Sequence, residues 1–306
     1  MNGGPTTEPR PDKKAPRDGR SLPWRSLAVV AGPSLLVATY AITGTLVTMA
    51  YTLGLRGGGS RRLAGPAWAV GALLPWAYLL FVRPWHSMWG ASQEEAGGPL
   101  PYDNFVPRPL AQTTRSITIE APPQEVWRWL VQLGVGRGGL YSYDWLENLA
   151  NLDVHSADEI FPELQDLEVG DLVRLAPERM AADAGWRVSA MEPESVLVLH
   201  QPAAPDTGLP IGRGDSDLGS YFGWNWAFVL REPEGGRTRL LVRSRVDGAP
   251  RPLVGGLYVL LLEFPHFVME RGMLKGIRRR AEGKPSSSGL LPLWSRRHLV
   301  SGSSRR

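Results

Sequence analysis

Two long stretches without a charged side chain lie near the N-terminus, and they constrain this chain more than any other feature. Residues 27–55 contain no Asp, Glu, Lys or Arg, and neither do residues 63–82, which stand between Arg62 and Arg83. A helix that spans a bilayer needs about 20 predominantly apolar residues. The two stretches therefore predict two membrane spans. A cleaved signal peptide has a shorter apolar region of about 7–15 residues, and a buried core helix is the alternative for the second stretch.

The connection between the two predicted spans is short, so residues 27–83 are expected to form a hairpin with both ends on one side of the membrane. Six Lys/Arg precede the first span and three lie in the loop 56–62, and this excess favours the cytoplasm for both ends. We expect a multi-pass protein of the cell membrane with a cytoplasmic soluble domain. Residues 1–26 and 284–306 are predicted as disordered basic tails, and residues 84–110 as a linker.

The charge of the chain is distributed unevenly. Residues 84–277 carry 16 Lys/Arg against 26 Asp/Glu, whereas the net charge of +4 comes from the ends. A nucleic-acid-binding domain is expected to carry its basic surface on the fold itself, so no nucleic-acid partner is expected, and basic ends suit an anionic lipid surface. The chain has no cysteine, which excludes disulfides, thiolate nucleophiles and zinc sites that need sulfur.

The pattern of a folded domain begins after residue 110. Alternation of apolar residues predicts strands, and a period of about 3.6 residues predicts helices. Strands are predicted at 115–120, 172–176, 186–191, 196–200, 221–231 and 237–246. Helices are predicted at 124–133 and 143–152, and a long one at 253–280. Pro265 lies inside the long helix and should kink it, because proline lacks the backbone donor and clashes with the preceding turn.

Two blocks of sequence resemble a group of bacterial proteins of the SRPBCC, or START-like, superfamily. They are GVGRGGLYSYDWLENLANLDVHSADEIFPELQDLEVGDLVRLAP (134–177) and PHFVMERGMLKGIRRRAE (265–282). The resemblance covers residues 111–283 and implies an α+β, helix-grip domain, in which an antiparallel sheet wraps a long C-terminal helix, here preceded by two transmembrane helices. The superfamily includes lipid-transfer domains, hormone binders and polyketide aromatase/cyclases, so the resemblance implies a cavity without naming its ligand. The hairpin and the long segment 201–219 depart from the pattern.

The implied cavity would lie between the sheet and the long helix, and the strand at 221–231 offers its lining. Trp224, Trp226, Phe228 and Leu230 alternate along that strand and so project to one face. Large aromatic side chains on one face form either a packed core or a cavity wall. We take Trp224, Trp226 and Phe228 as candidate ligand contacts, with a packed core as the alternative.

A glycine-rich loop, GVGRGGLYSYD (134–144), supplies the candidate polar groups. It does not have the G-x-G-x-x-G pattern that follows a strand in dinucleotide-binding folds, and no βαβ unit surrounds it. Its glycines favour unusual backbone dihedrals that would aim the neighbouring side chains. The candidate ligand contacts of this region are Arg137, Tyr141, Tyr143, Asp144 and, from the acidic segment that follows, His155. The alternative is a purely structural loop.

Two groups of side chains could ligate a metal, but each has an alternative explanation that we favour. Asp153 and His155 are two residues apart but have no further ligand. Glu263, His266 and Glu270 share one helical face, where ion pairs with arginines are the expected alternative to a metal. We therefore expect neither a metal nor another cofactor. Three arginines on one face of the 237–246 strand are expected in solvent, with an anionic headgroup as the alternative: Arg239, Arg243 and Arg245.

The sequence supports three hypotheses for function. The first is a membrane-tethered, non-enzymatic module that binds a lipid or other hydrophobic small molecule, because the tether would hold the cavity near the bilayer where such ligands partition. The second is a cyclase- or dehydratase-like enzyme in which Tyr141, Tyr143, Asp144 or His155 performs acid–base chemistry. The third is an interaction domain whose cavity is filled by its own side chains. We favour the first hypothesis.

Overall fold

The computed structural model of the chain describes Met49 and residues 78–149, 152–180, 184–201, 221–233 and 235–284. Within these residues no helix has the length and apolar character needed to cross a bilayer. Apart from Met49 and residues 78–82, both predicted spans lie outside the described residues, as do nearly all of the two predicted tails and of the segment 201–219. The described residues form the domain that follows the predicted hairpin.

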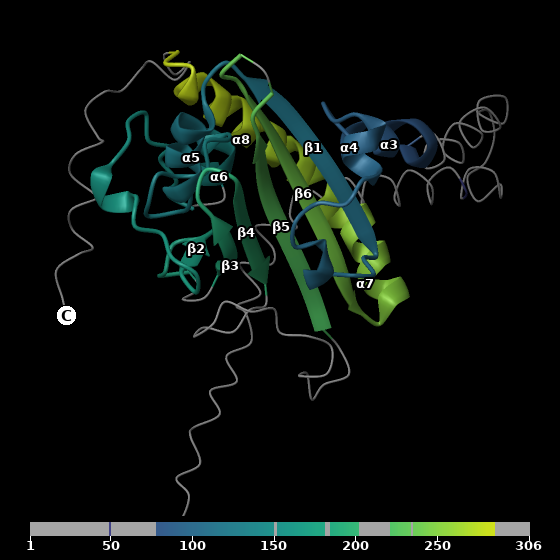
Figure 1. Ribbon diagram of the computed structural model, residues 1–306. Helices are drawn as coiled ribbons and strands as arrows, with labels where there is room; N and C mark the ends of the chain where they lie inside the picture. The colour runs from purple at the N-terminus through teal and green to yellow at the C-terminus, as the bar shows by residue number, and fades with distance from the viewer. Residues whose placement is uncertain are drawn as a thin grey trace, which may run out of the picture.

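The domain is an α+β fold built on one antiparallel sheet of six strands (Figure 1). The strands lie in the order β1, β6, β5, β4, β3, β2, so the first strand along the chain pairs with the last. Their bounds are β1 Ala111–Ile119, β2 Leu172–Arg174, β3 Gly185–Glu192, β4 Val196–Gln201, β5 Tyr221–Arg231 and β6 Thr238–Ala249. Strands β2 to β6 form a meander, and β1 adds to its last strand.

All six predicted strands are present, and β1 is longer than predicted. It begins at Ala111 because Gln112 and Thr114 pair with Arg245 and Arg243 of β6. The alternation that marks a half-buried strand is missing here, since every residue from 113 to 117 is buried. When both faces of a strand are covered, its sequence does not alternate between apolar and polar residues, so the pattern does not indicate where the strand begins.

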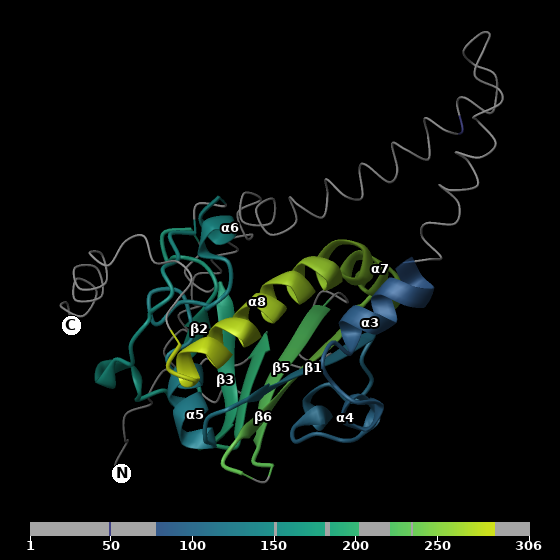
Figure 2. The same ribbon diagram turned by 90° about the horizontal axis from the view of Figure 1, so that it is seen from above.

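One long helix, α8 (Glu263–Ala281), lies across one face of the sheet, which we call the inner face (Figure 2). As predicted, Trp224, Trp226 and Phe228 all project to this face and join Leu274 and Ile277 of α8 in the main core. Two shorter helices, α5 (Pro123–Val131) and α6 (Asp144–Leu149), follow β1 along the chain. The arrangement agrees with the expected helix-grip architecture.

The predicted helix at 253–280 is interrupted just before Pro265. It consists of α7 (Arg251–Leu257), a turn of π-helix, η5 (Tyr258–Leu262), and α8. Proline cannot donate to the carbonyl four residues earlier and its ring crowds that turn, and the wider π turn relieves both constraints. The sequence therefore located the break to within one turn.

The segment 84–110, predicted as a linker, folds against the edge and the opposite, outer face of the sheet. It contains most of α3 (Arg83–Ser87), α4 (Gln93–Gly97) and a short 3₁₀ turn, η2 (Asp103–Phe105), and it follows the π turn η1 (Tyr78–Val82). The N–H of Ser116 donates to the oxygen of Trp89 at 3.1 Å, and its hydroxyl donates to the oxygen of Gly90 at 2.7 Å. These bonds cover the free edge of β1, where unpaired backbone groups would otherwise attract another strand.

The arginines of β6 hold this segment in place, so the prediction that they lie in solvent is wrong. Arg243 is buried, and its guanidinium donates to the carbonyl oxygens of Glu95, Ala96 and Gly98 and to the carboxylate of Asp103, the last at 2.7 Å. Arg239 pairs with Glu95 at 2.7 Å, and Arg245 with Asp103 at 3.0 Å. The carbonyls at the end of a helix and nearby carboxylates are strong partners for a guanidinium.

Candidate functional site

A group of polar and aromatic side chains is buried between the inner face and the first half of α8. We call it the inner cluster, and its members are Thr113, Arg115, Trp224, Trp226, Ser244, His266 and Glu270. The strand register brings the members together, because Thr113 lies opposite Ser244, which in turn lies opposite Trp226. Alternation along each strand turns all five strand members toward α8.

The charged centre of the inner cluster is an ion pair between Arg115 and Glu270. Their Nη1 and Oε1 atoms are 3.1 Å apart, and both side chains are excluded from solvent. Arg115 also donates from Nε to the backbone oxygen of His86 at 2.8 Å, and its guanidinium lies 5.2 Å from the ring centre of Phe267. Taking two charges out of water is unfavourable, and it is tolerated only when additional bonds of this kind complete the pair.

Glu270 is held as a carboxylate. The indole N–H of Trp226 donates to its Oε2 at 3.0 Å, and Nε2 of His266 lies 3.1 Å from the same atom. Burial alone would raise the pKa of Glu270, but Arg115 and His266 outweigh this effect, so the pKa lies below its ordinary value. Glu270 therefore serves charge pairing and positioning better than it would serve as a proton donor.

Several buried polar atoms in and beside the inner cluster have no hydrogen-bond partner among the described residues. They are Oγ1 of Thr113, Nη2 of Arg115, Nε1 of Trp186, Nε1 of Trp224 and Oγ of Ser244. Buried polar atoms are normally paired, and each unpaired one costs about 1–3 kcal/mol. Their concentration where β6 ends and β5 begins is typical of a place that receives a polar group from a ligand or a bound water.

The aromatic rings around these atoms are in contact with one another. Ring centres are 4.9 Å apart for Trp186 and Trp226, 4.8 Å for Trp226 and Phe228, and 4.8 Å for Trp224 and His266. Trp224 lies nearest the end of the sheet and is 9% exposed, whereas Phe228 is fully buried. Of the three predicted aromatic contacts, Trp224 and Trp226 belong to the inner cluster, and Phe228 belongs to the core beside it.

The glycine-rich loop lies against the second half of α8 rather than beside the inner cluster. A Cβ at Gly276 would lie 1.9 Å from the backbone oxygen of Tyr141, and one at Gly272 would lie 2.7 Å from the ring of Tyr143. Within the loop Gly134 and Gly139 form an antiparallel bridge. Gly272 and Gly276 of α8 therefore allow the loop to pack closely against the helix.

Two of the predicted polar contacts of this loop stabilise the fold. Arg137 donates from Nη2 to the backbone oxygens of Val131 at 3.1 Å and Leu164 at 2.8 Å. Tyr141 is buried beneath the guanidinium of Arg280, which lies 4.9 Å from the ring centre. Burial raises the pKa of the Tyr141 phenol well above its ordinary range, so the phenol stays protonated.

The remaining predicted contacts also lie apart from the inner cluster. Asp144 accepts hydrogen bonds from the N–H and the hydroxyl of Ser156, at 2.8 and 2.6 Å. His155 is largely exposed and lies 3.3 Å from Asp153. Within the described part of the chain, neither these side chains nor Tyr143 shares a hydrogen bond, ion pair or ring contact with the cluster.

Potential metal ligands are occupied by arginines instead. Glu263 pairs with Arg83 at 2.9 Å and Glu270 with Arg115, which confirms the ion pairs expected for this face of the helix. Among the described residues, no group of three or more His, Asp or Glu side chains is placed to hold a metal. The pair of Asp153 and His155 gains no third ligand there.

Glu147 of α6 is a buried acid beside the glycine-rich loop. The hydroxyl of Ser142 donates to its Oε1, and Oε2 has no partner among the described residues. Burial raises the pKa of Glu147 to about 7, and Ser142 opposes this rise only in part. The folded chain thus binds this proton up to a higher pH than the unfolded chain, so stability falls as the pH rises from about 4.5 to about 7.

Replacing Glu147 with glutamine should remove this part of the pH dependence, because glutamine accepts the same hydrogen bond without titrating. We expect the free energy of unfolding of the wild type to fall relative to that of Glu147→Gln by about 2–3 kcal/mol between these pH values. Urea titrations at several pH values would measure the difference. Glu125→Gln, at an exposed position, is the control. Equal pH slopes for wild type and Glu147→Gln would show that Glu147 is ionised in the folded chain.

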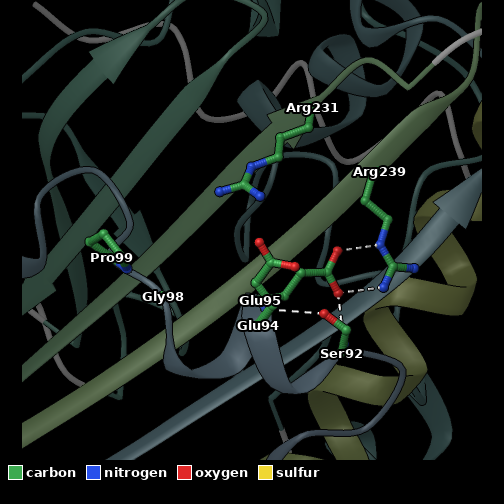
Figure 3. Close-up of a pocket in the computed structure, with 7 residues that line it drawn as sticks. All are labelled: Ser92, Glu94, Glu95, Gly98, Pro99, Arg231 and Arg239. Carbon is green, nitrogen blue, oxygen red and sulfur yellow. Dashed lines mark hydrogen bonds and ion pairs between the residues drawn. The ribbon is translucent and has the colours of Figure 1, made fainter.

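A hollow of about 460 Å³ lies on the outer face, beside α4 (Figure 3). It is lined by Ser92, Glu94, Glu95, Gly98, Pro99, Arg231 and Arg239. Glu95 and Arg239 close one side through two hydrogen bonds, and Arg231 extends over the other. The hollow belongs to the contacts that attach α4 to the sheet, and its lining is polar, unlike that of the inner face.

The sequence contained one unused signal for the inner cluster. Arg115 occupies the same face of β1 as Ile117 and Ile119, and an arginine in register with core residues has to find a buried partner. Glu263 and Glu270, which share one face of the long helix, were the candidate partners for Arg115. Thr113 and Ser244 gave no such signal, because small hydroxyl side chains are common on either face of a strand.

No protein-family model matches this chain, and no curated protein matches its sequence. Solved structures with some likeness include a protein of Arthrobacter aurescens, at 14% identity over 61% of this chain and 92% of that one, with a TM-score of 0.31. A protein of Mesorhizobium loti has 16% identity over 55% and 98%, with a TM-score of 0.28. An aromatase/cyclase of Streptomyces sp. R1128 has 12% identity over 58% and 98%, with a TM-score of 0.23. The six-stranded sheet and α8 themselves define the fold.

Proposed function

We propose that this protein is a membrane-tethered module that binds a lipid or another hydrophobic small molecule between the inner face and α8. The observation that supports this most is the set of unpartnered polar atoms within an aromatic surrounding, at Thr113, Arg115, Trp224 and Ser244. Ligand sites are mostly apolar and contain a few placed polar groups. A core that serves packing alone would be expected to contain apolar side chains at these positions, because unpaired buried polar atoms destabilise the fold.

The polar atoms indicate the chemistry of the ligand. The free positions of Arg115 and Trp224 can only donate hydrogen bonds, and the hydroxyls of Thr113 and Ser244 can donate or accept. The charge of Arg115 is already balanced by Glu270 at 3.1 Å. An apolar molecule with an uncharged acceptor, such as a carbonyl or an ether oxygen, would satisfy these donors without adding an unbalanced charge.

Binding requires a movement of side chains, and Trp224 is placed to make it. It lies near the start of β5, is 9% exposed and has a free indole N–H. Trp226 is tied to Glu270 through its own N–H. Rotation of Trp224 would open the end of the sheet while Trp226 and the ion pair stay in place.

The tether is the second part of the proposal. It rests on the charge-free stretches 27–55 and 63–82 and on the basic residues that flank them, which favour a multi-pass protein with both ends and the domain in the cytoplasm. A tethered site would draw apolar ligands from the bilayer, where they concentrate.

Binding is favoured over the cyclase- or dehydratase-like alternative by the placement of the acid–base candidates. Tyr141, Asp144 and His155 bond or stack with other parts of the fold, away from the inner cluster. Within the cluster, Glu270 is ionised and paired. The inner cluster therefore offers donors for recognition, and its one carboxylate is held in an ion pair rather than free to give up a proton.

The unpartnered hydroxyls provide the test. We expect the double variant Thr113→Val/Ser244→Ala to lose the lipid or metabolite that full-length wild-type protein retains in native mass spectrometry after purification in detergent. Its free energy of unfolding in urea, measured without ligand, should not fall, because hydroxyls without partners contribute no hydrogen bonds.

Ser116→Ala is the matched control, since Ser116 is an equally buried serine whose hydroxyl donates to Gly90 on the outer face. It should retain the bound mass and lose about 1 kcal/mol of stability. Equal retention of bound mass by the double variant and the control would contradict the proposed site. A wild-type protein that retains no small molecule and gains no thermal stability from any lipid extract would contradict the proposed function.

A further inference from the structure

Eight large apolar side chains are exposed at one end of the domain. They are Leu79, Leu80, Phe81, Val82, Trp85, Leu253, Leu257 and Phe264, and we call them the end patch. Phe81, at 73%, is the most exposed of them. Single exposed apolar residues are ordinary on a protein surface, whereas a contiguous set marks a contact with another apolar surface.

Two parts of the chain that are far apart in sequence form the end patch. Arg83, the first residue of α3, pairs with Glu263, the first residue of α8, at 2.9 Å. The rings of His86 and Phe264 are 5.7 Å apart, and those of Trp85 and Phe267 are 5.3 Å apart. Figure 2 shows α3 and α7 at the same end of the sheet. Leu79–Val82 therefore lie at the same end of the molecule as Leu253 and Leu257.

The charges around the end patch are basic. Arg83, Arg108 and Arg251 lie beside it, and Arg251 donates to the backbone oxygen of Arg108. Among the described residues, the two neighbouring acids are occupied, since Glu263 is buried against Arg83 and Asp247 pairs with Arg251 at 2.6 Å. An apolar surface with an aromatic and basic rim suits the interface of an anionic bilayer.

We infer that the end patch rests in the headgroup–acyl interface of the bilayer, with α7 lying on the membrane surface. Leu79–Val82 are the last residues of the charge-free stretch 63–82, so the patch is continuous with the predicted second span. The ion pair between Arg83 and Glu263 then holds the start of α8 at the depth where that span ends. The inference rests on the proposed tether, and it adds an orientation of the domain that the tether alone does not impose.

This orientation places the inner cluster next to the bilayer. Strand β6 leads directly into α7, and Ser244, Thr113 and Trp224 lie in the part of the sheet nearest to it. The end of the sheet that carries Trp224 therefore faces the membrane. A hydrophobic ligand would pass between bilayer and domain without crossing water.

The absence of cysteine from the chain makes the orientation directly measurable. Single-cysteine variants of the full-length protein would be labelled with a bimane fluorophore and reconstituted into nanodiscs of anionic lipid, with brominated acyl chains as quenchers. Leu257→Cys reports the end patch, and Ala69→Cys reports the middle of the predicted second span. Val169→Cys, before β2, is the matched control, since Val169 is 49% exposed and Leu257 is 48% exposed.

We expect brominated lipid to remove most of the emission of the labels at positions 257 and 69 and to leave that at position 169 unchanged. Quenching at position 69 without quenching at position 257 would overturn the end-patch inference and leave the tether in place. In that case another copy of the protein or another part of the chain would cover the patch. Absence of quenching at position 69 would overturn the proposed tether. Quenching at position 257 would then show that the domain binds the membrane surface without a membrane span. Equal quenching at positions 257 and 169 would also overturn the proposed orientation.

Discussion

Arg115→Met is expected to lower the free energy of unfolding by about 3–5 kcal/mol. The variant leaves Glu270 buried with its charge unbalanced, whereas in the wild type the Nη1 and Oε1 atoms are 3.1 Å apart in a site without solvent. It also removes the hydrogen bond to the oxygen of His86, which ties α3 to β1. Urea titration of the full-length protein in detergent, followed by tryptophan fluorescence, would measure the loss.

Two further variants test whether the loss of stability in Arg115→Met arises from the burial of the ion pair. Arg128→Met removes an exposed partner of Glu125, where both side chains are about half exposed, and should cost no more than about 1 kcal/mol. The double variant Arg115→Met/Glu270→Met replaces both charges with apolar groups and should recover most of the stability lost in Arg115→Met. A cost for Arg115→Met as small as that of the exposed control would show that the pair is hydrated in solution.

Gly276→Ala is expected to cost at least about 3 kcal/mol, at the upper end of the range for added volume in a packed interior. The new Cβ would lie 1.9 Å from the backbone oxygen of Tyr141 and 3.0 Å from its Cβ. Relief requires the glycine-rich loop to move as a unit away from α8, since the close atom belongs to the backbone. The same unfolding titration would measure the cost, and hydrogen exchange would show faster opening of the loop.

Gly256→Ala is the helical control for this substitution. A Cβ at Gly256 would meet no atom within 4 Å, and alanine favours the helix, so this variant should be neutral or more stable by up to about 1 kcal/mol. Equal effects at the two positions would contradict the close packing of the loop on α8. The comparison also tests the interpretation that this loop is structural, because a loop that gates a ligand site would tolerate displacement more readily.

The local elements of this fold follow from the sequence. Alternation along 221–231 placed Trp224, Trp226 and Phe228 on one face, because a strand turns successive side chains to opposite sides. The position of Pro265 located the break before α8, because proline acts on the turn that precedes it. The shared face of Glu263 and Glu270 followed from helical spacing. Each of these inferences depends on neighbours within a few residues.

The partners of the buried charges were decided by the tertiary structure alone. Arg243 and Asp103 are 140 residues apart in sequence, and Arg115 of β1 meets Glu270 of α8. Their meeting depends on the register of β1 against β6 and on the segment 84–110 folding back over the sheet. The polar loop candidates, such as Arg137 and Asp144, were separated from the tryptophans for the same reason. A short-range pattern specifies which side of an element is apolar, but which elements face each other is set by packing over the whole domain.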